Sequence, residues 1–170
     1  ILDSGSDSKF NAIGKETAAM VSGAYQSYKL NNAASGSTSF QDLTPYMNYV
    51  KVDTTTTIDD TYNGTTQNCF AASRSCILLH NGALLYHRTG VTDQFGDTSS
   101  TSSILFEIDP DGRVTSTGAA GTAGKSVQIA MYFNGRVTTI GNIEPNTYYG
   151  GGGAINPLPA NDPPWFNWGN

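Results

Sequence analysis

The stretch SKFNAIGKETAAMVSGAYQSYKL, residues 8–30, is the only long segment of the chain with helical periodicity. Apolar or small side chains recur in it every three or four residues, which predicts a helix with one apolar face. The side-chain oxygen of Ser8 can accept a hydrogen bond from the first turn, so we expect the helix to begin there. The face predicted to pack in the core consists of Phe10, Ile13, Thr17, Met20, Val21, Ala24 and Tyr28.

Apolar runs separated by turn residues dominate the chain between residues 76 and 140, and they predict an antiparallel sheet. Asn81-Gly82 and Asn134-Gly135 each lie between two such runs. Asn-Gly is the strongest short-range hairpin signal, because both turn residues must adopt positive φ. The run Ile104–Ile108 supplies a further strand. We therefore predict an α+β fold, with one N-terminal helix packed on an antiparallel sheet of four to five strands.

The length of 170 residues suits a single domain, residues 1–170. We expect a polar lead-in, the helix, a connecting loop, the sheet, and an irregular tail rich in glycine, proline and aromatic residues. The loop should contain a helical turn capped by Ser39 and an exposed edge strand at Tyr49–Thr55. The expected bounds are 8–30 for the helix, 31–75 for the loop, 76–140 for the sheet and 141–170 for the tail.

The composition indicates a protein that works outside the cell. Charged residues make up 14% of the chain, against ~25% in ordinary soluble domains, and Thr, Ser, Asn and Gly take their place. The net charge is −5 and no block of basic residues occurs, so nucleic acid is not an expected partner. No apolar run reaches the ~20 residues of a membrane span, and no signal peptide is recognisable.

The two cysteines, Cys69 and Cys76, are separated by a short polar segment. This spacing and the extracellular composition predict a disulfide bond between them. A ring this short stabilises the fold by roughly 2–3 kcal/mol at best. Two free thiols are the alternative, whereas a metal site is disfavoured because no second Cys or His pair supplies the missing ligands.

The sequence contains no recognisable catalytic motif: Gly-x-Ser-x-Gly, His-Glu-x-x-His and Walker patterns are all absent. His80 and His87 flank the first hairpin, and we interpret both as packing or surface residues. We expect a protein that is not an enzyme, with no catalytic residues, metal ligands or cofactor. A structural calcium ion is the alternative for the oxygen-rich turns at Asp59-Asp60, Asp93–Asp97 and Asp109–Gly112.

Three segments together resemble type IV pilins and type II secretion pseudopilins. The run Ala24–Asn31 is similar to the second half of their N-terminal helix. Phe40–Met47 looks like the segment that leads from that helix into the αβ-loop, and Ile104–Gly112 resembles an acidic strand and turn of many pseudopilin-like sheets. The family's basic leader and very apolar first helix half are expected upstream, with Ile1-Leu2 as the last remnant of that half.

The resemblance implies a structural subunit of an extracellular type IV pilus-like filament or secretion pseudopilus, which acts by assembly and surface display. Its partners would be identical or related pilin subunits. The missing helix half would hold the subunit in the inner membrane before assembly, and the assembled subunit would lie in a filament at the cell surface.

The alternative interpretation is a secreted β-rich adhesin or glycan-binding module that uses Trp165, Phe166 and Trp168 of the tail. Large aromatic side chains in such a tail are expected to dock on the domain or on a neighbour. The sequence upstream of Ile1 distinguishes the two. A leader followed by ~20 apolar residues favours the pilin, and a plain secretory signal favours the binding module.

Overall fold

The computed structural model describes residues 2–52, 57–60, 65–68, 76–87, 93–110, 127–139, 148–149, 153–154 and 166. Within these ranges, side chains are described for residues 8–52, 76–87, 93–110, 127–139 and 166. The second half of the predicted turn Asp109–Gly112 and the predicted disulfide partner Cys69 lie outside the described residues.

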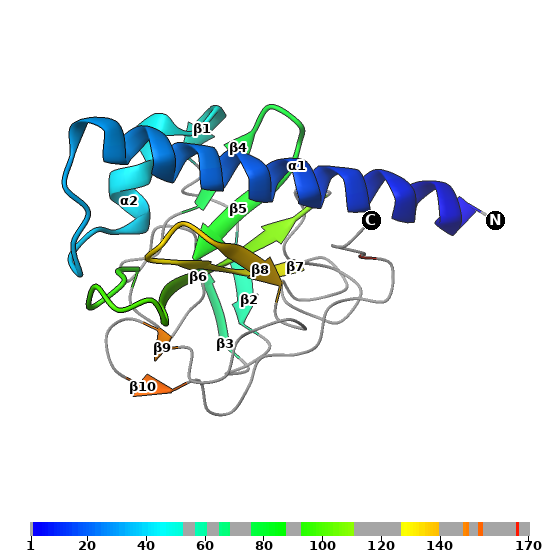
Figure 1. Ribbon diagram of the computed structural model, residues 1–170. Helices are drawn as coiled ribbons and strands as arrows, with labels where there is room; N and C mark the ends of the chain where they lie inside the picture. The colour runs from blue at the N-terminus through cyan, green and yellow to red at the C-terminus, as the bar shows by residue number, and fades with distance from the viewer. Residues whose placement is uncertain are drawn as a thin grey trace.

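The described chain forms one long helix, two short helical segments and ten strands (Figure 1). The helical elements are α1 (Leu2–Asn31), α2 (Phe40–Leu43) and the 3-10 turn η1 (Thr44–Tyr46). The strands are β1 (Tyr49–Val52), β2 (Thr57–Asp60), β3 (Thr65–Asn68), β4 (Cys76–Leu79), β5 (Leu84–His87), β6 (Ser102–Asp109), β7 (Val127–Tyr132), β8 (Val137–Thr139), β9 (Tyr148–Tyr149) and β10 (Gly153–Ala154).

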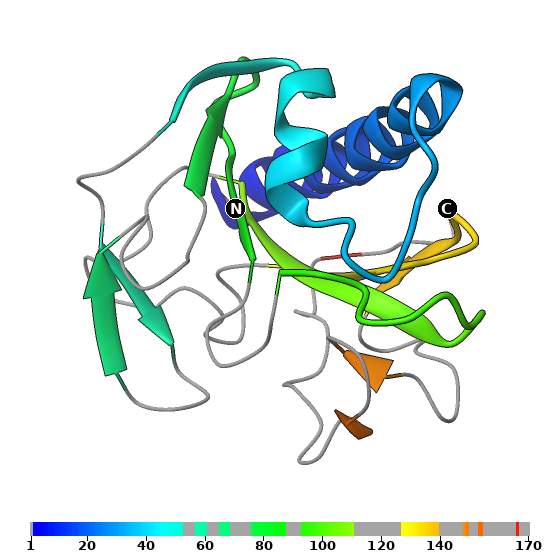
Figure 2. The same cartoon turned by 90° about the vertical axis from the view of Figure 1, so that its left-hand side faces the viewer.

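Six strands form the main antiparallel run of the sheet, in the order β1-β4-β5-β6-β7-β8. At one end of β6, β9 joins in parallel through Ser102 and Tyr148, and β10 pairs with β9. The hairpin of β2 and β3 makes a separate two-stranded sheet, which stands apart from the main sheet in Figure 2.

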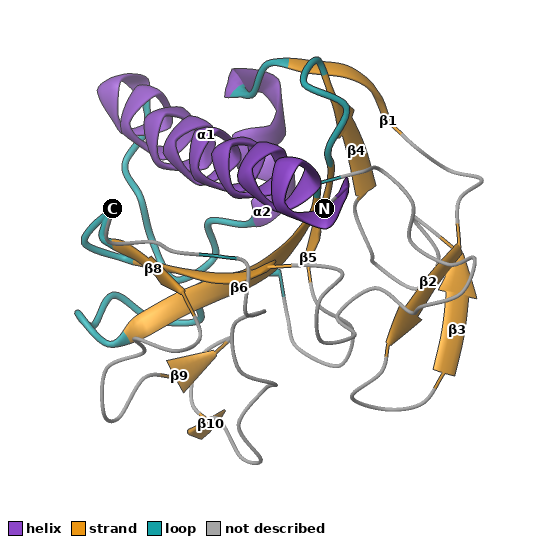
Figure 3. Ribbon diagram, turned by 90° about the vertical axis from the view of Figure 1, so that its right-hand side faces the viewer, coloured by secondary structure: helices purple, strands orange, loops and turns teal. Residues whose placement is uncertain are grey.

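Helix α1 lies across one face of the main sheet, with α2 on the same side (Figures 1 and 3). Ile77, Leu85, Ile108 and Val127 form one row of cross-strand partners over β4, β5, β6 and β7, and all four are fully buried. They share one apolar core with the buried side chains of α1. Burying an aliphatic side chain of this size contributes ~1.5–3 kcal/mol, so this helix–sheet contact is a main source of stability.

Local chemistry explains the elements that the sequence predicted. Asn81-Gly82 joins β4 to β5 and Asn134-Gly135 joins β7 to β8, with φ of 89° at Gly82 and 93° at Gly135. Ser39 caps α2 as predicted: its Oγ accepts a hydrogen bond of 3.2 Å from Asp42 N, and Asp42 Oδ2 accepts one of 2.9 Å from Ser39 N.

The predicted helix bounds of 8–30 are too narrow, because α1 begins at Leu2 and ends at Asn31. Ser8 therefore lies inside the helix and is not its cap. Once a helix has formed, each added residue gains a hydrogen bond at low cost, so even a polar turn can extend it.

The strand count was also predicted too low, at four to five against the six of the main antiparallel run. Two further segments differ from the predicted loop and tail. The hairpin of β2 and β3 lies in the predicted loop 31–75, and β9 and β10 lie in the tail predicted to be irregular. Threonine favours strands because its branched side chain packs well on a pleated surface, which accounts for strand formation in the Thr-rich part of the loop.

Candidate functional site

The face of α1 that packs on the sheet is wider than the predicted stripe. Of the seven predicted residues, Ile13, Thr17, Val21 and Ala24 are buried, and Phe10, Met20 and Tyr28 are half-buried. Gly14, Ala18 and Tyr25 are also buried and were not predicted. Helices of globular proteins commonly bury a face more than 100° wide. The sequence prediction included only a narrow stripe and therefore missed the buried positions beside it.

Tyr25 is the anchor of this contact. Its side chain is fully buried, and its hydroxyl group donates a hydrogen bond of 2.6 Å to the backbone carbonyl oxygen of Phe133 at the end of β7. Its ring lies 5.3 Å from the ring of Phe95 between centroids, and Lys29 Nζ lies 4.3 Å from the Tyr25 centroid. Burial, with a smaller effect from Tyr28, raises the pKa of Tyr25 to about 12. The C-terminal half of α1 is therefore held by packing and by a directional bond.

The N-terminal turns of α1 differ from this seated part. Figure 1 shows the blue end of the helix running past the edge of the sheet. Of the described side chains before Ile13, Ser8, Lys9 and Ala12 are exposed, whereas Phe10 and Asn11 are half-buried. The helix therefore has one end embedded in the domain and one end that projects from it. None of the described helices is both long and apolar enough to cross a membrane.

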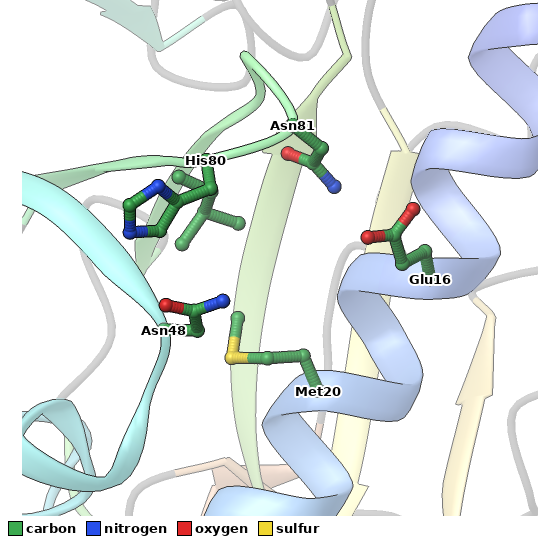
Figure 4. A pocket seen from close by; sticks show the side chains of 6 residues that line it. Glu16, Met20, Asn48, His80 and Asn81 are labelled. Carbon is green, nitrogen blue, oxygen red and sulfur yellow. The ribbon is translucent and has the colours of Figure 1, made fainter.

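A small pocket opens between α1 and the β4–β5 turn (Figure 4). Its volume of about 40 Å³ accommodates a few water molecules at most. Glu16 and Met20 of α1 line one side, with Asn81 and His80 of the turn and Asn48 on the others. Asn81 Nδ2 donates a hydrogen bond of 3.2 Å to Thr17 Oγ1, so this amide fastens the turn to the helix.

The two histidines do not form a pair. Leu78 lies opposite Leu84 in the β4–β5 ladder, so this register does not set His80 opposite His87. His80 is exposed at the pocket, whereas His87 is 4% exposed with its ring 6.2 Å from that of Phe40. His87 thus takes part in core packing.

The oxygen-rich turn at Asp93–Asp97 is organised by its own hydrogen bonds. Asp97 Oδ1 accepts hydrogen bonds from Ser102 Oγ and, at 2.8 Å, from Ser99 N. These bonds, that of Ser102 first, hold the pKa of Asp97 below its ordinary value. In the part of the chain that the structure describes, no three His, Cys, Asp or Glu side chains are grouped so that they could hold a metal ion.

The remaining predicted features are seen in part. Cys76 is fully buried at the start of β4, and no described cysteine is free. The partner Cys69 lies outside the described residues, so the disulfide between them stays a prediction.

Of the three tail aromatics, Phe166 is 8% exposed and belongs to the core. Trp165 and Trp168 lie outside the described residues.

Compared with known proteins, the chain matches no protein-family model, no curated protein and no solved structure.

Proposed function

We propose that this chain is the globular head of a filament subunit of the type IV pilin or type II secretion pseudopilin class. It acts by assembly and surface display, without catalysis. Its partners are identical or related subunits, and its place is a filament at the cell surface.

The observation that carries this proposal is the division of α1 into a seated and a projecting part. Residues 13–25 supply the buried side chains that contact the sheet, whereas the N-terminal end runs past it (Figure 1). A helix whose only role was to pack in the core of this domain would not need an end that extends past the sheet. A subunit that joins a helical filament core needs one, because its neighbours must reach the helix without unfolding the head.

The way the helix is seated supports the same proposal. Tyr25 binds Phe133, and Asn81 binds Thr17, so two hairpin turns of the sheet are fastened to α1. These bonds hold the helix at one angle to the head. In the proposed subunit, an apolar segment before Ile1 continues the projecting end, anchors the subunit in the inner membrane, and then packs against other subunits in the filament.

Deletion of the gene, with complementation by the full-length gene, tests this function. We expect the deletion to remove or alter filaments that can be sheared from cells, and the complemented strain to recover them. Filaments that stay unchanged in the deletion strain, together with the full-length protein released into the medium as a monomer, would count against the proposal.

A further inference from the structure

No further inference is drawn: the strongest candidate, the surface patch at the outer edge of the main sheet where Tyr49, Val50 and Val52 of β1 are exposed, carries none because nothing in the described part of the chain shows what covers it.

Discussion

The hydroxyl group of Tyr25 in α1 donates a hydrogen bond of 2.6 Å to the backbone carbonyl oxygen of Phe133, which lies 108 residues later in the chain. This bond joins the helix to the β7–β8 turn. As a polar link between the two layers of the described fold, it fixes the rotation of the helix as well as its distance from the sheet.

Replacement of Tyr25 by phenylalanine should lower the free energy of unfolding by about 1–2 kcal/mol. The ring still packs, but the partly buried carbonyl group of Phe133 loses its donor, and a polar group that is shielded from water and left without a partner is costly. Chemical denaturation at neutral pH measures the loss. Tyr28→Phe removes the same atom from a half-buried ring of the same helix and should change stability by less than about 0.5 kcal/mol. Equal effects of the two substitutions would show that the bond contributes nothing.

The stability of the protein should also fall at high pH because of Tyr25. Its pKa rises from 10.0 to about 12 on folding, so the folded state holds the proton more tightly than the unfolded state. This contribution is fully present below pH 10 and is lost as pH rises through about 12. Denaturation midpoints measured across this window should fall more steeply for the unchanged protein than for Tyr25→Phe. Parallel curves would contradict the raised pKa.

A pair of neighbouring alanines tests whether α1 is seated as described. Ala18 is fully buried, whereas Ala19 is exposed. Ala18→Asp places a charge in the core and should destabilise the fold by about 3–5 kcal/mol. Ala19→Asp makes the same change on the solvent side and should cost no more than about 0.5 kcal/mol. Similar melting temperatures for the two variants would rule out the described orientation of the helix.

The disulfide between Cys69 and Cys76 is tested by intact mass. The unreduced protein should resist alkylation, and reduction followed by alkylation should add two labels, because the chain has two cysteines. Two alkylated thiols without reductant would refute the bond.

Several elements could be predicted because their signals are local. Each of the two Asn-Gly dipeptides lies between apolar runs and itself favours a turn of the backbone. Ser39 and Asp42 form a capping box within four residues. The burial of Ile13 and Val21 follows from helical spacing alone.

The missed elements lack such signals. The segment between β2 and β3 contains Asn63-Gly64, the same dipeptide that marks the other hairpins, but polar runs flank it and no apolar alternation accompanies it. The parallel pairing of β9 with β6 depends on a contact between distant segments. The contact between Gly14 and Phe166 joins residues at opposite ends of the chain, so neither residue's neighbours in the sequence reveal it.

The most direct test of the proposed filament role is immunogold electron microscopy of filaments sheared from cells, with antibodies raised against the 170-residue chain. We expect gold particles on the filaments, along their length for a major subunit or at few positions for a minor one, and none on filaments from the deletion strain. Unlabelled filaments, with the protein recovered only as a soluble monomer in the medium, would contradict the filament role.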